Sequence, residues 1–245
     1  MGEGTIGWRL HVGSIFPTPI PPRAIREWYE VVPDGVDTTC VSLTIQQLTD
    51  SDMEDALKGM ERAAKQLANF DVEIIYQGGV PPVVVRGPGF ADELADRLSQ
   101  ASGLPVITDM TAVLEAMRAM NLRTLAMATP FRPFINERLV SYLASEQITV
   151  INDTALGIER NTEIRRLPIP VEYNVARKTF LDSKRRPDGI YIACGGWGSI
   201  HNVELLERDL DTTVVTWMNA WVWSAMKRGK VAGPIKGCGK LLASL

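Results

Sequence analysis

Short apolar runs alternate with amphipathic segments along nearly the whole chain. The apolar runs are rich in β-branched residues and predict strands at residues 5–12, 37–44, 72–76, 105–107, 123–129, 149–152, 190–193 and 213–215. The segments between them place apolar residues at helical spacing. They predict helices at 24–30, up to about 67, at 90–101, 109–120, within 130–145, and at 169–182, 201–208 and 216–227. Such alternation is typical of parallel sheets joined by crossover helices.

Two similar strand ends lie about half a chain apart. Residues 74–79 read Ile-Ile-Tyr-Gln-Gly-Gly, and residues 191–196 read Tyr-Ile-Ala-Cys-Gly-Gly. A duplicated α/β unit would explain both turns, although a parallel strand can end in Gly-Gly without duplication. We therefore predict an α/β fold with two pseudo-symmetric lobes, each a parallel sheet of the four-stranded type flanked by helices, and an active-site cleft between them.

The predicted lobes divide near residue 110. Residues 1–110 would form an N-terminal α/β lobe and residues 111–215 a C-terminal α/β lobe. The helical segment 216–245 can pack back on the first lobe. Asp109 or Thr111 is expected near the cap of the helix that follows this boundary.

Cys194 is the first candidate for chemistry, because it follows an apolar strand directly and precedes two glycines. Ligands in open α/β sheets bind at the carboxyl ends of the strands. Amide groups and a helix N-terminus at such a turn would lower the pKa of the thiol and make it useful as an acid, base or nucleophile. The alternative is a structural cysteine that packs as a small hydrophobic residue.

Composition and charge exclude several classes of protein. The 245 residues are 45 % hydrophobic, enough for a sizeable core, and the net charge of −3 offers no basic surface for nucleic acid. No apolar run is long enough to span a membrane, and residues 1–4 do not resemble a signal peptide, so we expect a cytoplasmic protein without membrane contact. A homo-oligomer is left open.

Metals and cofactors are not expected either. Three cysteines without close spacing and two histidines give no disulfide framework and no metal-binding motif. No glycine-rich nucleotide-binding motif follows a strand, so we expect no cofactor.

A series of short motifs, in a fixed order over almost the whole chain, resembles a known family. The motifs are Thr5-Ile6-Gly7, Arg86-Gly87, Ala101-Ser102-Gly103-Leu104-Pro105, Thr111-Ala112-Val113-Leu114, Ala128-Thr129, Asn136-Glu137-Arg138-Leu139, Asp188-Gly189-Ile190 and Cys194-Gly195-Gly196. In this order they resemble the aspartate/glutamate racemase superfamily, in particular its branch that holds arylmalonate decarboxylase and maleate cis-trans isomerase. The resemblance implies two pseudo-symmetric lobes, a small carboxylate substrate and no cofactor.

The resemblance also implies roles for the two repeated turns. Racemases and isomerases of the superfamily use two facing cysteines, whereas arylmalonate decarboxylase keeps only the second. Here the first position is Gly79 and the second is Cys194, which matches the decarboxylase pattern. Cys194 would then protonate a carbanion or enediolate as a general acid, with Gly195 and Gly196 beside the substrate and the Gly195 amide holding an oxyanion.

The oxyanion pocket departs from the decarboxylase. Where that enzyme has Thr, Ser and Tyr, this chain has Val80, Pro81 and Phe131, so three hydroxyl donors are absent at expected substrate-binding positions. Pro81 also lacks a backbone N–H. Losing one oxyanion donor typically costs on the order of 100-fold in rate, so the substrate differs or other donors replace these.

Three further residues are candidates for replacement roles. His11, predicted at the end of the first strand, could orient a carboxylate or exchange a proton opposite Cys194; the alternative is a histidine bonded to a backbone carbonyl. Tyr76 and Gln77 flank the Gly79 turn and could supply a hydrogen bond, or simply pack.

The sequence is compatible with four functions. The first is an arylmalonate-decarboxylase-like enzyme on a small carboxylic acid with Cys194 as general acid or base. The second is a maleate isomerase-like or racemase-like enzyme that pairs Cys194 with His11. The third is a hydrolase with a cysteine nucleophile. The fourth is a small-molecule binding protein without catalysis.

Overall fold

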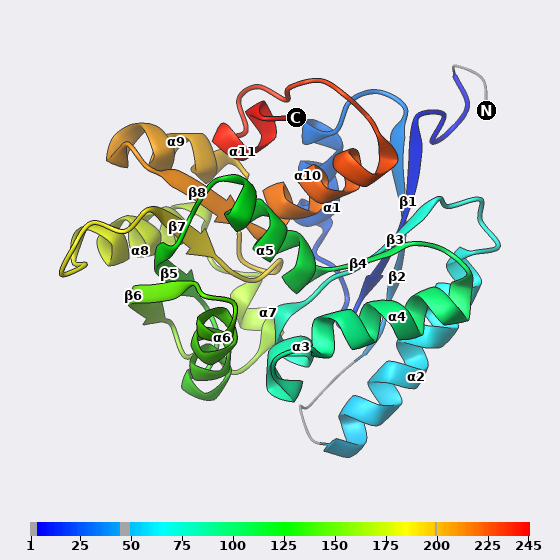
Figure 1. Ribbon diagram of the computed structural model, residues 1–245, viewed down its shortest axis with the longest axis horizontal. Coiled ribbons are helices and arrows are strands. Elements are labelled where there is room, and N and C mark those ends of the chain that lie inside the picture. The colour runs from blue at the N-terminus through cyan, green and yellow to red at the C-terminus, as the bar shows by residue number, and fades with distance from the viewer. Residues whose placement is uncertain (1–3, 45–49, 199) are drawn as a thin grey trace.

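Two four-stranded parallel sheets form the centre of the protein (Figure 1). The computed structural model describes residues 4–44, 50–198 and 200–245. The first sheet has the order β2-β1-β3-β4, and the second has the order β6-β5-β7-β8. The strands are β1 (Leu10–Phe16), β2 (Val36–Ser42), β3 (Ile74–Gln77), β4 (Val106–Thr108), β5 (Thr124–Thr129), β6 (Thr149–Ala155), β7 (Gly189–Ile192) and β8 (Thr213–Thr216). The predicted α/β fold of two sheets flanked by helices is confirmed.

The two sheets share one topology. In each, the first strand of the lobe pairs with the second and the third, and the third pairs with the fourth, always in parallel. Strands β3 and β7 therefore occupy equivalent central places. They are the strands that end in the two similar turns of the sequence, at Gly78-Gly79 and at Cys194-Gly195.

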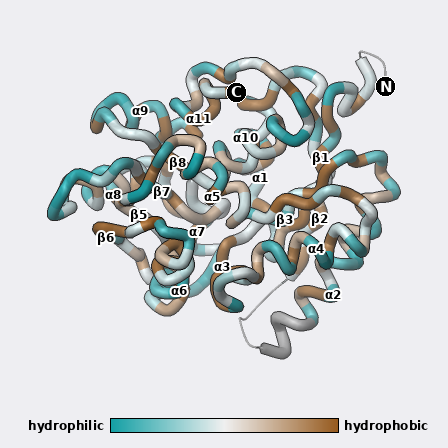
Figure 2. The backbone as a smooth tube through the Cα atoms, in the orientation of Figure 1, coloured by the Kyte–Doolittle hydropathy of each residue, from teal (hydrophilic) through white to brown (hydrophobic). Residues whose placement is uncertain are grey.

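Helices cover the outer faces of both sheets and fill the space between them (Figure 1). They are α1 (Pro22–Val31), α2 (Asp50–Leu67), α3 (Val80–Arg86), α4 (Phe90–Ser102), α5 (Asp109–Ala119), α6 (Pro133–Ser145), α7 (Asn161–Ile164), α8 (Ile169–Leu181), α9 (His201–Leu210), α10 (Trp217–Gly229) and α11 (Lys240–Ala243). Helices α2 and α4 pack on the first sheet, and α6, α8 and α9 on the second. Figure 2 shows hydrophobic colouring along β1 and β3 and hydrophilic colouring on the loop after α8.

The chain after β8 returns to elements of the first lobe. Helix α10 packs against α5, β3 and α1. Its Trp221 is fully buried and stacks on Trp28 of α1, with ring centroids 4.0 Å apart, and on Tyr76 of β3 at 4.8 Å. This aromatic stack joins the C-terminal helix to the first lobe, while the lobe boundary near residue 110 stays a prediction.

The first strand differs from the sequence prediction. It was expected at residues 5–12 but runs from Leu10 to Phe16. Gly4 and Gly7 both have positive φ angles, +92° and +63°, which interrupt an extended strand. The polar Ser14 nevertheless fits inside the sheet, because its hydroxyl bonds to Thr38 Oγ1 at 2.8 Å.

A second difference follows β3. Residues 80–86 carry Pro81 and Pro82 and were not expected to be helical, yet they form α3. Proline is tolerated in the first turn of a helix, where its missing N–H would have no partner within the helix. The helix turns Val80 and Pro81 toward the region between the lobes.

In the described part of the chain, no helix combines the length and apolar character needed to cross a membrane. The same residues contain no cluster of three or more His, Cys, Asp or Glu side chains arranged to hold a metal ion.

Candidate active site

A cavity of about 180 Å³ lies where the carboxyl ends of the two sheets meet. It receives residues that follow β1, β3, β4, β5, β6, β7 and β8. Its lining includes Phe16, Pro17, Thr18, Gly79, Val80, Pro81, Asp109, Phe131, Arg132, Glu159, Asn161, Ile164, Arg165, Cys194, Gly195, Gly196 and Trp217. A cavity of roughly 150 Å³ holds a benzene ring, so this one suits a small molecule with one ring or a short chain.

Cys194 reaches the cavity from the turn after β7 in an unusual backbone conformation. Its φ angle is +93°, beyond the left-handed helical range that the other described non-glycine residues with positive φ occupy. Such a conformation costs on the order of 1–3 kcal/mol and persists where surrounding contacts enforce it, often at functional sites. The next residue, Gly195, is close to the Trp217 ring, since a Cβ added there would lie 3.1 Å from that ring.

The thiol of Cys194 is partly buried and protonated at neutral pH. Burial raises its pKa to about 11, although the amide groups of Gly196 and Trp197 and the charge of Arg165 oppose the shift. The sequence-based expectation of a lowered pKa is therefore wrong. Desolvation of the thiolate outweighs the stabilisation that the nearby N–H groups provide.

Helix α1 of the first lobe holds the loop that follows Cys194. Arg23 Nη2 donates to the carbonyl oxygen of Trp197 at 2.6 Å, and Glu27 Oε2 accepts from the amide of Ile200 at 3.1 Å. Glu27 is almost fully buried. The position of the cysteine turn thus depends on contacts from the opposite lobe.

The equivalent turn in the first lobe has no room for a side chain. Gly79 has φ +106°, and a Cβ there would lie 2.6 Å from Cγ of Pro17. The neighbouring wall is formed by Val80, Pro81 and Phe131, all of which line the cavity as the sequence predicted. This side of the cavity is apolar and carries none of the three hydroxyl groups of the resembling decarboxylase.

Asp109 is a cavity residue that the sequence prediction missed. It directly follows β4, is 2 % exposed, and accepts a hydrogen bond on Oδ2 from the Gly79 amide at 3.0 Å. Its Oδ1 is also buried, and the Tyr76 hydroxyl lies beside the carboxyl group. Burial raises the pKa of the carboxyl to about 6, against the opposing effects of the Gly79 amide and the nearby Tyr76 hydroxyl. The signal was present in the sequence, because Asp109 follows a strand, but a helix cap explained it equally well.

Arg165 places a positive charge beside the cysteine turn. It follows α7, lines the cavity, and its Cγ would lie 3.8 Å from a Cβ at Gly196. Within the described residues its side chain forms no ion pair with a carboxylate. Arg132 and Glu159 also line the cavity but are exposed at its rim.

His11 does not reach the cavity, which corrects the sequence prediction. Because β1 begins at Leu10 and not near residue 5, His11 lies at the amino end of the strand, and the opposite end carries Phe16 to the cavity. The ring Nε2 lies 2.8 Å from Thr39 Oγ1. A pairing of His11 with Cys194 has no structural support.

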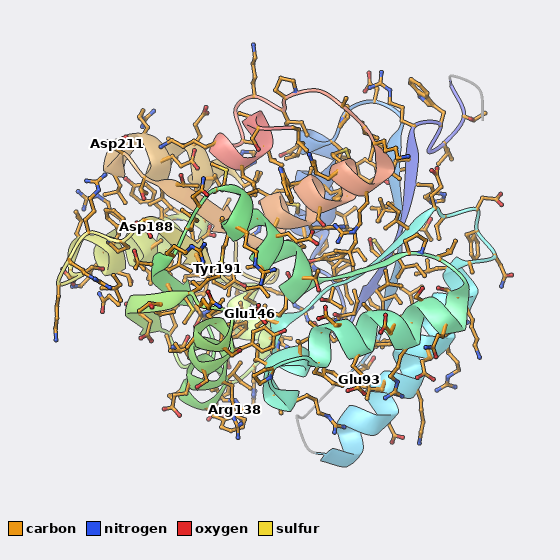
Figure 3. All side chains as sticks on the ribbon, viewed as in Figure 1. Glu93, Arg138, Glu146, Asp188, Tyr191 and Asp211 are labelled. Atoms are coloured by element: carbon orange, nitrogen blue, oxygen red, sulfur yellow. The ribbon has the colours of Figure 1, made fainter. Side chains whose placement is uncertain are left out.

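Tyr76 and Gln77 are buried beneath the cavity and do not line it. Tyr76 stacks on Trp221, and the Gln77 side-chain amide donates to the carbonyl oxygen of Gly78 at 2.6 Å. Figure 3 shows Tyr191 in the middle of the molecule, with charged residues such as Glu93, Arg138 and Asp211 toward the periphery. Of the predicted site residues, the structure brings together Gly79, Val80, Pro81, Phe131, Cys194, Gly195 and Gly196.

Comparison with known proteins gives the same family by sequence and by structure. An arylmalonate decarboxylase from Bordetella bronchiseptica is 28 % identical over 185 residues, which cover 76 % of this chain and 77 % of that protein. A maleate isomerase from Nocardia farcinica is 28 % identical over 190 residues, covering 74 % of each chain. The structure of unliganded arylmalonate decarboxylase matches with a TM-score of 0.85 at 25 % identity, over 96 % of this chain and 100 % of that one.

A structure of the Nocardia farcinica maleate cis-trans isomerase, a mutant with a covalently bound succinylcysteine intermediate, shares the fold. Its TM-score is 0.86 at 21 % identity, over 96 % of this chain and 99 % of that one. The sequence model of a family described as arylmalonate decarboxylase matches residues 17–242. The chain therefore belongs to the arylmalonate decarboxylase family, within the superfamily of aspartate/glutamate racemase-like decarboxylases and isomerases.

Proposed function

We propose that this chain is a cofactor-independent enzyme that transfers a proton at a carbon atom of a small carboxylic acid, with the Cys194 thiol as the proton donor. The observation that carries the proposal is the neutral thiol of Cys194, held in a strained turn on the wall of a small-molecule cavity. A general acid must hold its proton at the working pH, and a thiol with a pKa of about 11 does so. Family membership supports the class of reaction.

In the decarboxylase form of the reaction, the bond between the α-carbon and one carboxyl group breaks. The electron pair of that bond enters an enediolate formed with the remaining carboxyl group, and CO2 leaves. Cys194 then gives its S–H proton to the α-carbon. The thiolate that remains is stabilised by the nearby Gly196 and Trp197 amides and by Arg165, and it regains a proton from water.

The cavity wall has polar groups for the carboxylate that stays and apolar groups for the carboxylate that leaves as CO2. The retained carboxylate needs a cation or several donors. Arg165, Thr18, Asn161 and the amide of Gly195 would supply them, because these residues line the cavity. The departing carboxylate becomes neutral CO2, and an apolar wall favours the neutral product because an unpaired buried charge is costly. Val80, Pro81 and Phe131 would provide that apolar wall.

The other functions considered from the sequence receive less support. A cysteine nucleophile requires a thiolate, and the raised pKa of Cys194 leaves little of it at neutral pH. An isomerase that uses His11 lacks a histidine at the cavity. A binding protein without catalysis would not need a strained cysteine on the wall.

The test compares Cys194→Ser with Cys40→Ser as the control. Cys40 is also partly buried, lies on β2 and is not a cavity residue. We expect Cys194→Ser to lower the decarboxylation of α-methyl-α-phenylmalonate, or the isomerisation of maleate, by roughly 10²- to 10⁴-fold, because general acid catalysis typically contributes that factor. Cys40→Ser should keep the wild-type rate. Wild-type activity that survives Cys194→Ser would overturn the proposal.

A further inference from the structure

We propose that Asp109 is a second proton-transfer group of this cavity, a base on the wall of the first lobe that faces Cys194 across the substrate. The inference rests on the proposed function of Cys194 and adds a partner to it. It also adds a substrate class, carboxylic acids that carry a hydrogen on the α-carbon.

The side chain of Asp109 is fixed on the wall of the cavity. The side chain lines the cavity, is almost fully buried, and is fixed through Oδ2 by the amide of Gly79. Oδ1 is also buried, and the Tyr76 hydroxyl beside the carboxyl group stabilises its ionised form. A carboxylate held on a cavity wall in this way is positioned to act as a base on a bound ligand.

The pseudo-symmetry of the two lobes places Asp109 next to the turn that is equivalent to the Cys194 turn. The turn after β7 presents Cys194, and the equivalent turn after β3 presents Gly79, where Pro17 leaves no room for a side chain. Asp109 comes from the adjacent strand end, after β4, and is bonded to the backbone of that same turn. The first lobe therefore supplies a carboxyl group next to the position equivalent to the cysteine.

Asp109 and Cys194 have different protonation states at neutral pH because their surroundings shift their pKa values to different ranges. Tyr76 of β3 and Tyr191 of β7 lie near Asp109 outside the cavity lining, whereas Cys194 and Arg165 line the cavity. Burial raises the pKa values of both tyrosines, so both stay neutral. The Asp109 carboxyl, with a pKa of about 6, is largely ionised at neutral pH, whereas the Cys194 thiol stays protonated. Two groups whose surroundings push their pKa values apart in this way suit the roles of base and acid.

The reaction follows from these two protonation states. The Asp109 carboxylate takes the hydrogen of the α-carbon as a proton, and the electron pair of that C–H bond enters an enediolate with the substrate carboxylate. Cys194 donates its S–H proton to the opposite face of the carbon, which inverts the configuration. Asp109 is then neutral and Cys194 a thiolate, and exchange of protons with water restores both.

The test uses one enantiomer of 2-phenylpropionate in D2O and follows deuterium at the α-carbon together with loss of optical purity. The variants are Asp109→Asn, which keeps an acceptor for the Gly79 amide, and Asp96→Asn as the control on the exposed face of α4. We expect Asp109→Asn to slow exchange roughly 10²- to 10⁴-fold, as for loss of a general base. Asp96→Asn should keep the wild-type exchange rate, because its side chain lies outside the cavity.

The pH profile gives a second readout that does not depend on the variant. Exchange by the wild-type enzyme should rise with pH as Asp109 ionises around its pKa of about 6. Exchange by Asp109→Asn equal to that of Asp96→Asn, or a wild-type rate that is flat between about pH 5 and 7, would overturn the role of Asp109. If the role of Asp109 fails in this way but Cys194→Ser still loses decarboxylation, the proposed function of Cys194 remains supported. Absence of both reactions in the wild-type enzyme would overturn the two together.

Discussion

Cys194 combines a backbone angle that side chains rarely adopt with a thiol that burial keeps protonated. Both properties arise from its surroundings and not from the residue itself. The turn after β7 directs the sulfur to the cavity, and the lack of solvent there disfavours the thiolate. A residue in this state is suited to give a proton to a strongly basic carbon, and poorly suited to attack as a nucleophile.

A single substitution at Arg165 tests whether this residue binds the substrate carboxylate. We expect Arg165→Met to raise the KM for a carboxylate substrate, or the concentration of phenylacetate that protects Cys194 from iodoacetamide, by roughly 10- to 100-fold. This follows from the loss of a hydrogen bond to a charged group, worth about 1.5–3 kcal/mol. Arg166→Met is the matched control, because Arg166 is exposed and lies outside the cavity lining. Equal effects of the two substitutions would contradict a binding role for Arg165.

At the scale of elements, the site is a collection of strand ends held by helices of the opposite lobe. Helix α1 carries Arg23 and Glu27, which bond to the loop after Cys194. Within the loop, the amides of Trp197 and Gly198 donate to the carbonyl oxygen of Cys194, and the contacts from α1 help to fix where this turn lies.

Replacement of Arg23 should loosen that loop without removing any cavity residue. We expect Arg23→Met to accelerate amide hydrogen exchange at residues 195–198 and to lower kcat more than it changes KM. The lost charge-assisted hydrogen bond is worth about 1.5–3 kcal/mol. Arg26→Met, exposed on the same helix, is the control. Unchanged exchange in the loop would show that Arg23 does not position it.

Most of the strand ends at the site could be predicted from the sequence. Buried parallel strands read as continuous apolar runs, which is why β7 and its turn were located and Cys194 was identified. The position of His11 was predicted wrongly, because Gly7 interrupts the pattern and shifts the strand by several residues. Asp109 and Arg165 were missed because their roles depend on contacts with Gly79 and Gly196, each about 30 residues away in the chain.

In the molecule as a whole, a repeated four-strand topology forms the cavity, and differences between the two halves define its chemistry. The same four-strand topology occurs twice, and the cavity lies where the two sets of carboxyl ends meet. The first half has no side chain at Gly79 and supplies Asp109, whereas the second half supplies Cys194 and Arg165. The stacking of Trp221 on Trp28 and Tyr76 ties the end of the chain to the first lobe and so helps fix one half against the other.

The fold class followed from the alternation of strands and helices, because the physical rules for parallel sheets leave few arrangements. The set of residues that line the cavity could not be predicted as directly from the sequence. Side chains from seven strand ends converge there, and the sequence alone gives neither their distances nor the degree of burial that sets the two pKa values.

The pH dependence of Cys194 alkylation by iodoacetamide, with the modified site identified by mass spectrometry, tests the central claim most directly. A thiol with a pKa of about 11 should react at a rate that rises with pH throughout the range from about 7 to 10 without a plateau, because only the thiolate reacts. Cys238, which lies in the C-terminal loop, serves as an internal comparison. A plateau for Cys194 below a pH of about 8.5, the ordinary pKa of a cysteine, would mean an activated thiolate and would contradict its role as a protonated general acid.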